Sequence, residues 1–232
     1  MPRPRHASPV PKPPGRYHHG DLRRALLDTA LRVVEAQGVD ALSLRDLARK
    51  LGVSHAAPDH HFPDRLSLLV ALAIEGFDRL AVAMEAAASA VPPGPGRLAA
   101  VGEAYLRFAL DHPSHTQIMY GREVGGMTVR PPELRVAADR SGRILEEAIE
   151  DIAGLPRRAP GTPRHPFVEL HRLTAWALAH GAARLWIDGP MRASLERHGG
   201  GRAQFEARAG AAIALMTQAV ARAASERRSG ER

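Results

Sequence analysis

Apolar residues recur at helical spacing along most of the chain, most clearly between residues 41 and 69. One apolar set falls at positions i, i+3, i+4 and i+7 and comprises Leu44, Leu47, Ala48 and Leu51. This spacing predicts a helix with one buried face. The basic side chains of the stretch stand outside that face, namely Arg45, Arg49 and Lys50. Ser43 and Asp46 have the S-x-x-D spacing of a capping box, which predicts that the helix begins here.

The segment after this helix has the residues of a tight turn between two helices. Gly52 can adopt the positive φ of a helix C-terminus, Val53 can fill the corner, and Ser54 can cap a second helix. That helix, residues 55–62, is expected to be short and exposed because Pro63 cannot continue it. Two short helices joined by a glycine turn form a helix-turn-helix, whose second helix can enter a DNA major groove. The same spacing also occurs in helical hairpins that bind no DNA.

Helices are predicted on both sides of this motif. Asp21 is the expected cap of a first helix that ends at Gly38 and buries Leu22, Leu26, Ala30 and Val33. Asp64 is expected to cap a long helix with an apolar series through Leu66, Leu69, Val70, Ala73, Phe77, Leu80 and Met84. Further helices are expected over residues 97–112, 114–120, 133–153, 167–187 and 203–224, with a flexible glycine-rich break at 121–127 and a loop at 155–166.

Composition favours helices over strands. Aromatic residues make up only 4% of the 232 residues, whereas alanine is abundant, so an all-α fold is predicted. The expected division is a basic arm at 1–16, a helix-turn-helix domain at 17–66, a larger helical domain at 67–226 and a tail at 227–232. The proline-rich arm contains no acid and is expected to be disordered. It either adds phosphate or minor-groove contacts or is an unstructured leader.

Charge and cysteine content narrow the possible partners. The net charge of +7 and the pI near 10.8 suit a nucleic acid, although membranes and acidic proteins also attract cations. The absence of cysteine excludes disulfides, thiolate metal sites and a cysteine nucleophile. The sequence has no apolar run of about 18 residues and no secretion signal, so a cytoplasmic protein without a membrane partner is expected.

Motifs for catalysis and metal binding are not found in the sequence. There is no G-x-S-x-G, Walker, H-E-x-x-H or dinucleotide glycine pattern, so neither an enzyme nor a cofactor is predicted. The pairs His18/His19 and His60/His61 lack further ligands at metal spacing, and adjacent helical positions point in different directions. They instead predict a pH effect, because histidines near phosphates become charged as the pH falls toward about 6 and strengthen binding.

Two segments carry a family resemblance. LSLRDLARKLGVS (42–54) and HAAPDHHF (55–62), followed by Arg65, resemble the N-terminal domain of the TetR family of one-component transcriptional regulators. The likeness covers about residues 17–80, and WALAHG (176–181) is similar to the W-x-x-x-H-G signature of one type of TetR C-terminal domain. The resemblance implies a repressor that binds a palindromic DNA operator as a homodimer through its last two helices and is released by a small-molecule effector.

The resemblance also assigns residues to two sites. The expected DNA-contacting residues are Ser43, Arg45, Ser54, His55, Ala56, Ala57, Asp59, His60 and Arg65. Arg45 is expected on a guanine or a phosphate, Ser43 and Arg65 are expected on phosphates, and residues 55–57 and 60 on base edges or a thymine methyl. The expected ligand pocket lies in the C-terminal domain, with candidate lining residues Tyr105, Phe108, Met119, Tyr120, Trp176, His180 and Trp186. The same residues could instead be ordinary core.

Asp59 departs from the family pattern, which usually has a phosphate-binding tyrosine at this position in Y-x-H-F. A carboxylate facing a phosphate is repulsive and opposes non-specific DNA affinity. Alternatively, Asp59 accepts a hydrogen bond from a cytosine amine, or pairs with a neighbouring histidine or with Arg65. Two rival functions therefore stay open: an architectural DNA-binding protein without an effector, and a TetR-like scaffold with weakened DNA binding.

Overall fold

The computed structural model describes residues 19–230, and within that range the chain is helical and contains no strand. The elements in chain order are α1 (His19–Gln37), η1 (Val39–Ala41), α2 (Leu44–Leu51), η2 (Pro58–His60), α3 (Arg65–Ser89), α4 (Pro95–Asp111), α5 (Pro113–Tyr120), α6 (Arg122–Gly125), α7 (Pro132–Ala153), α8 (Pro166–Ile187), α9 (Pro190–Glu196) and α10 (Arg202–Gly230). The predicted all-α fold is confirmed. The predicted arm at 1–16 and His18 lie outside the described residues.

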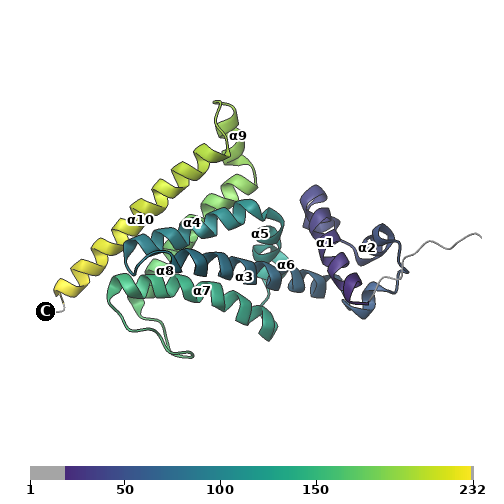
Figure 1. The fold of residues 1–232 in the computed structure, drawn as a ribbon, viewed down its shortest axis with the longest axis horizontal. Helices are drawn as coiled ribbons and strands as arrows, with labels where there is room; N and C mark the ends of the chain where they lie inside the picture. The colour runs from purple at the N-terminus through teal and green to yellow at the C-terminus, as the bar shows by residue number, and fades with distance from the viewer. Residues whose placement is uncertain (1–18, 231–232) are drawn as a thin grey trace, which may run out of the picture.

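A small N-terminal domain and a larger helical domain share α3, which runs from one into the other (Figure 1). The small domain packs α1, α2 and the start of α3 around fully buried leucines, including Leu26, Leu47 and Leu68. α1 begins two residues before Asp21, so that residue lies in its first turn and is not the predicted cap. The predicted boundary between residues 66 and 67 falls in the first turn of α3, so one continuous helix joins the two domains.

The turn of the helix-turn-helix follows the predicted chemistry at its glycine and departs from it at its serines. Gly52 ends α2 with φ of 67°, a left-handed conformation that costs other residues free energy. Ser43 occupies the N-cap position of α2, but its side chain makes no capping hydrogen bond, and Asp46 pairs with Arg49 instead. The capping box predicted at α2 is therefore wrong. The helix start depends on burial of its apolar face.

The segment predicted as a second α-helix is not an α-helix. Residues 55–57 form a turn and residues 58–60 a 3₁₀ helix, with hydrogen bonds from Ala57 N to Ser54 O (3.0 Å) and from His61 N to Pro58 O (2.9 Å). Pro58 has no N–H, so the i→i−4 bond that would join it to Ser54 cannot form. The segment keeps helical curvature with tighter winding.

The capping box that does form lies at the start of α3. The Asp64 carboxylate accepts a hydrogen bond from Ser67 N (2.7 Å), and Asp64 N donates to Ser67 Oγ (3.2 Å). The predicted cap at Asp64 is confirmed, and the apolar face of α3 is buried from Leu68 to Met84, whereas Leu66 is 39% exposed. α3 then packs against α4, α5 and α7 in the larger domain.

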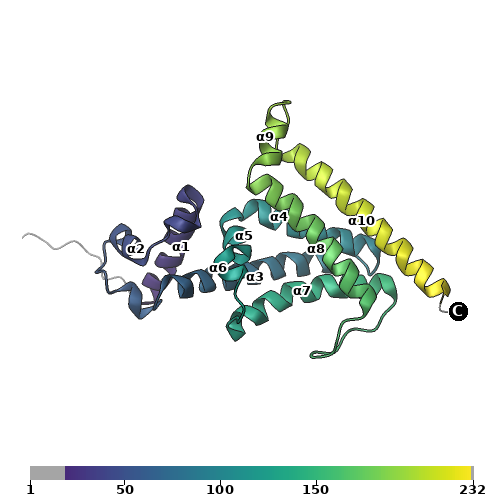
Figure 2. The same ribbon diagram turned by 180° about the vertical axis from the view of Figure 1, so that it is seen from behind.

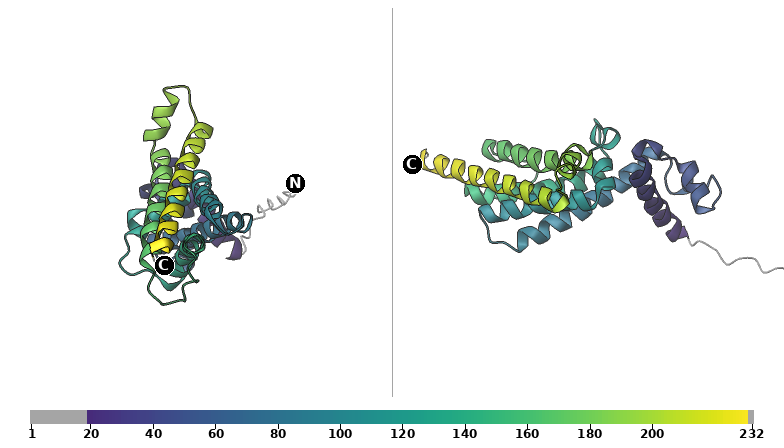
Figure 3. Two further views of the ribbon diagram at one scale, coloured as in Figure 1. Left: turned by 90° about the vertical axis from the view of Figure 1, so that its left-hand side faces the viewer. Right: turned by 90° about the horizontal axis from the view of Figure 1, so that it is seen from above.

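The larger domain contains two short helices that the sequence pattern did not predict, α6 in the expected glycine break and α9 between the last two long helices. α10 extends through Gly230, six residues beyond its predicted end, because Arg227 and Arg228 donate to the carbonyls of Ala153 and Ile152 at the end of α7. Seen from behind, α8 and α10 lie side by side at one face (Figure 2), and two further views agree (Figure 3). None of the described helices is long and apolar enough to cross a membrane.

Candidate DNA-binding surface and ligand cavity

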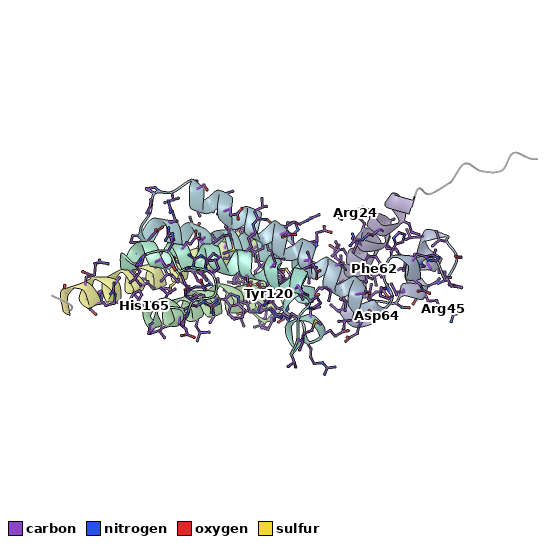
Figure 4. All side chains as sticks on the ribbon, turned by 90° about the horizontal axis from the view of Figure 1, so that it is seen from below. Arg24, Arg45, Phe62, Asp64, Tyr120 and His165 are labelled. Carbon is purple, nitrogen blue, oxygen red and sulfur yellow. The ribbon has the colours of Figure 1, made fainter. Side chains whose placement is uncertain are left out.

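The predicted DNA-contacting residues of α2 and the following turn form one exposed surface at the outer end of the small domain. The side chains open to solvent are Arg45, Ser54, His55, Ala56, Asp59 and His60, while Ser43 and Ala57 are half-buried. Figure 4 places Arg45 at this outer end. The surface is polar and basic, as a protein surface that contacts phosphates and base edges must be.

Two buried residues hold this surface in place from below. Pro58 is buried, and Phe62 is 2% exposed with the guanidinium of Arg23 5.3 Å from its ring centroid. Because these two side chains point into the domain, Asp59 and His60 between them point outward. Anchoring of this kind orients a short segment that has few backbone hydrogen bonds of its own.

Asp59 makes no hydrogen bond or ion pair with any other described residue. Its pairing with a histidine or with Arg65, one of the alternatives drawn from sequence, is not observed. The carboxylate is therefore free to meet DNA, where phosphate repulsion and acceptance from a cytosine amine remain the two alternatives.

Arg65 does not belong to the exposed surface, although the family resemblance implied that it contacts a phosphate. Its Nε donates to Leu42 O (2.9 Å), one terminal nitrogen donates to Val39 O (2.7 Å), and the other pairs with the carboxylate of Glu123 in α6. All three donor groups are thus engaged within the chain. Arg65 is a positioning residue that links the segment before α2 to the larger domain, because its guanidinium is oriented inward.

The larger domain contains a cavity of about 950 Å³ bounded by helices α3 to α8 and by the loop between α7 and α8. Four of the residues predicted for ligand contact line it, namely Tyr105, Tyr120, Trp176 and His180. Figure 4 shows Tyr120 inside this domain, in the part nearer the small domain. The volume is that of a pocket for a drug-sized molecule.

The aromatic side of the cavity is centred on Tyr120. Its ring centroid lies 4.6 Å from that of His180, 5.6 Å from Phe77 and 6.0 Å from Trp176. Tyr105 Oη lies 2.7 Å from His180 Nδ1, in a hydrogen bond whose direction depends on the imidazole tautomer. Burial, with a smaller contribution from Arg184, lowers the pKa of His180, and burial raises the pKa of both tyrosines. This side is therefore uncharged near neutral pH.

Three residues predicted for ligand contact do not line this cavity. Phe108 is buried with its ring 4.9 Å from His112, and Trp186 stacks on Phe205 at 4.9 Å. Met119 is 1% exposed and packs under Gly76, where its sulfur would clash with any added Cβ. Aromatic and methionine side chains at helical spacing are often core, and these three serve packing.

The opposite side of the cavity was not predicted from sequence. It carries seven arginines, Arg130, Arg135, Arg140, Arg143, Arg158, Arg164 and Arg172, together with Asp139 and the buried Glu146. The only sequence signal for this side was the group of basic residues in the loop at 155–166. Such a group is typical of a solvent-exposed loop, and only the structure shows that the loop folds over α7. Among the described residues no group of three or more side chains is arranged to hold a metal ion.

A small helix-turn-helix domain joined through one helix to a larger all-helical domain defines a class of DNA-binding transcriptional regulators. Two family models match the chain: "Bacterial regulatory proteins, tetR family" over residues 26–72 and "Tetracyclin repressor-like, C-terminal domain" over residues 98–207. The chain belongs to the TetR family of transcriptional regulators.

Solved structures share the fold over nearly the whole chain. A protein with unknown function from Rhodococcus sp. RHA1 is 35% identical, with a TM-score of 0.69 over 89% of this chain and 98% of that one. The TetR family transcriptional regulator PfmR from Thermus thermophilus is 24% identical, with a TM-score of 0.59 over 83% of this chain and 97% of that one, and shares the fold.

Two curated relatives match a part of the chain. The regulator BetI of Rhizobium meliloti is 45% identical over 49 residues, which are 21% of this chain and 24% of that protein. The repressor Rv1474c of Mycobacterium tuberculosis is 39% identical over 64 residues, 28% of this chain and 34% of that protein. The matched segments thus span about a quarter and a third of these two relatives.

Proposed function

We propose that this protein is a homodimeric repressor that binds an inverted-repeat operator and leaves it when a small molecule fills the cavity of the larger domain. The observation that carries the proposal is the continuous connection between the exposed surface around Arg45 and the cavity through α3 and Arg65. A DNA-reading surface joined to a ligand cavity is the arrangement that ligand-controlled DNA binding requires.

Dimerisation through α8 and α10 is supported by apolar side chains that these helices leave uncovered. Leu170, Leu173 and Leu185 on α8 are 60%, 55% and 47% exposed, and Leu215 on α10 is 68% exposed. Large apolar side chains exposed on two neighbouring helices favour association, since burying them releases water. A two-fold dimer presents two copies of the DNA-binding surface to two half-sites about one helical turn apart.

Repression is the proposed outcome of binding because an operator-bound dimer occludes a promoter. The relative Rv1474c, which matches 64 residues of this chain, is described as a repressor. An architectural DNA-binding protein without an effector does not require a cavity of about 950 Å³. A scaffold with weakened DNA binding does not require a basic surface that faces solvent and is held in place by buried residues.

The route from the cavity to the DNA-binding surface runs through α6. Tyr120 at the end of α5 and Gly125 at the end of α6 line the cavity, and Glu123 in α6 pairs with Arg65. Arg65 in turn holds the carbonyls of Val39 and Leu42 just before α2. A ligand that displaces α6 therefore acts on the placement of α2, provided that it binds the displaced form better than the DNA-binding form.

The decisive test of the function is selection of genomic DNA fragments by the purified dimer. We expect enrichment of an inverted repeat, bound at least about 1,000 times more tightly than scrambled duplex at physiological salt. Equal affinity for both duplexes at every salt concentration would leave the architectural alternative, and absence of binding to either would leave the scaffold.

The coupling route has its own test in the free protein. Replacing Glu123 by Gln removes the charge that pairs with Arg65, so amides of residues 39–47 should exchange hydrogen faster than in the wild type. The matched control is Glu133→Gln, because Glu133 is exposed on α7 and makes no ion pair with the described residues. Unchanged exchange in Glu123→Gln would remove α6 from the route.

A further inference from the structure

The cavity has two chemically different sides. One side is aromatic and aliphatic, from α3, α4, α5 and α8, and the other is lined by arginines from α7, α8 and the loop between them. A smaller apolar cavity of about 20 Å³, lined by Met84, Leu145 and Trp176 among others, adjoins the aromatic side. The two sides thus differ in charge across a single volume.

The arginine side is organised around one buried carboxylate. Glu146 is 1% exposed, and its oxygens lie 3.2 Å from Arg158, 3.3 Å from Arg143 and 3.9 Å from Arg172, with Arg164 in direct contact. Burial raises the pKa of Glu146, but hydrogen bonds and charge from Arg164 and Arg158 outweigh it and keep the pKa below its usual value. Glu146 is therefore ionised and holds the four guanidiniums in place.

These arginines have more positive charge and more donors than Glu146 can satisfy. Arg143 has two further carboxylate partners, Glu147 and Glu150, but Arg158, Arg164 and Arg172 share Glu146 as their carboxylate partner among the described residues. Three guanidiniums facing one carboxylate leave a local excess of positive charge. An anion that enters the cavity from solvent lowers that excess.

Arg164 and Arg172 also keep donors that the described residues do not use. Arg164 contacts Glu146 through Nε alone, and Arg172 Nε is buried without a hydrogen-bond partner in that part of the chain. Arg158 differs, because its nitrogens already donate to Glu146, Ala159 O and Thr162 O. The terminal nitrogens of Arg164 and Arg172 donate no hydrogen bond to a described residue, and both side chains line the cavity, so these nitrogens can donate to an oxygen of a ligand.

At the rim the charges are mixed. Arg140 is neutralised by a bidentate pair with Glu85 (2.8 and 2.6 Å), and Asp139 lies one helical turn from Arg135. Arg130 donates to Gly125 O (3.1 Å). Arg164 and Arg172 thus combine a shared carboxylate partner with unused terminal donors, and they line the same cavity as Tyr120 and Trp176.

We propose that the effector cavity accepts an amphiphilic organic anion, whose carboxylate or phosphate is bound by Arg164 and Arg172 and whose apolar body lies against Tyr105, Tyr120 and Trp176. The inference rests on the proposed function only in taking this cavity as the ligand site. An organic cation of the same shape is disfavoured by the excess charge, and a neutral ligand leaves the guanidinium donors without an acceptor.

The test compares two fluorescent probes with the same aromatic body in the absence of DNA. 8-Anilinonaphthalene-1-sulfonate carries a sulfonate, and N-phenyl-1-naphthylamine lacks it. We expect the sulfonate to bind about tenfold more tightly to the wild type, the effect of one charge-assisted contact. Arg164→Gln should remove that advantage and leave the neutral probe unchanged.

The matched control is Arg157→Gln, which removes the same charge from the same loop. Arg157 does not line the cavity, because it pairs with the Asp151 carboxylate and donates to Glu147 O. It should leave both affinities unchanged. Trp176→Ala should weaken both probes, which shows that they occupy this cavity and not the exposed leucines of α8. Melting temperatures within a few degrees of the wild type verify that the variants are folded.

Displacement of the sulfonate probe then identifies the head group. Decanoate and decyl phosphate represent the two anions, and 1-decanol and decyltrimethylammonium represent neutral and cationic ligands. We expect at least one anion to displace the probe about tenfold better than the alcohol or the cation. Equal displacement by all four, or no effect of Arg164→Gln, overturns the inference.

The outcome is separable from that of the proposed function because the probes are titrated without DNA. If anions bind the cavity but do not change affinity for the selected inverted repeat, the anion site stands and effector release is wrong. If no anion is preferred while the dimer still selects an inverted repeat, the anion inference fails and the DNA-binding proposal stands.

Discussion

The two arginine-rich regions of this protein use the same side chain in opposite ways. On the small domain, Arg45 is exposed and makes no ion pair with a described residue. In the larger domain, Arg158, Arg164 and Arg172 are held by the buried carboxylate of Glu146. Free, solvated charges suit a long polyanion whose counterions are released on binding, whereas fixed and partly dehydrated charges suit a small anion with defined geometry.

The comparison predicts that removing one carboxylate from the cavity wall has the largest effect on stability. Glu146→Gln leaves the surrounding arginines without their buried counter-charge and should lower the free energy of unfolding by about 3 to 5 kcal/mol in urea denaturation. Glu147→Gln is the control, because that side chain is 44% exposed and should change stability by less than about 0.5 kcal/mol. Equal effects would contradict the difference in environment.

The next effect comes from His115, which lies where α1, α3 and α5 meet. Burial lowers its pKa to about 4, although Glu75 at 3.8 Å opposes that shift, and Arg79, His112 and Arg24 lower the pKa further. The neutral imidazole is thus favoured in the folded state. The stability that neutral His115 contributes is fully present above the pKa of the unfolded state, about 6.5. It is lost as the pH falls toward the folded-state pKa of about 4.

Between pH 7 and pH 5 this difference amounts to about 2 kcal/mol of lost stability, measured as the shift in urea midpoint at the two pH values. His115→Gln should remove most of the pH dependence, and His180, whose pKa is also lowered, accounts for a smaller remainder. A wild-type protein equally stable at both pH values would show that the site protonates without penalty.

An effect of similar size is expected at the exposed Arg45, where the change weakens DNA binding and leaves folding unaffected. Arg45→Ala should weaken operator binding by about 1 to 3 kcal/mol and relax preference at one base pair if the side chain reads a guanine. A uniform loss across sequences, with a shallower salt dependence, would assign Arg45 to a phosphate. Its unfolding free energy should stay within about 0.5 kcal/mol of the wild type because the side chain is exposed.

The smallest expected effect is at Asp59. Asp59→Tyr should tighten operator binding by about 1 kcal/mol, the size of one solvent-screened charge interaction near a phosphate. Asp59→Asn separates the loss of the carboxylate charge from the gain of the tyrosine phenol, because it removes the repulsion without adding a phenol. Weaker binding of both variants, confined to operators with a cytosine at one position, would favour direct reading of that base by the carboxylate.

Much of the small domain could be predicted from sequence because its interactions are local. The apolar spacing around Leu47, the positive φ at Gly52 and the cap at Asp64 each involve residues within a few positions of one another. The errors arose where a local rule had a competitor. Pro58 prevents an α-helix after the turn, and the Ser43 hydroxyl does not form the expected cap.

The cavity could be predicted only in part, because only some of its residues are related by local helical spacing. Trp176 and His180 are one turn apart on α8, so their shared face follows from helical periodicity. Phe108 and Trp186 have equally favourable sequence patterns, and only packing directs them to His112 and Phe205 instead of the cavity. Side-chain type alone does not distinguish core from lining.

The sequence by itself determined the helical fold, the DNA-binding domain and its exposed basic residues, because helical periodicity and turn chemistry act over short separations. Only the tertiary structure decided that Arg65 links Leu42 to Glu123, which lies 58 residues after Arg65, and that Arg164 meets Glu146 across a loop. Contacts of that kind depend on how helices pack. The sequence therefore does not distinguish an arginine that faces DNA from one that faces a buried carboxylate or a ligand.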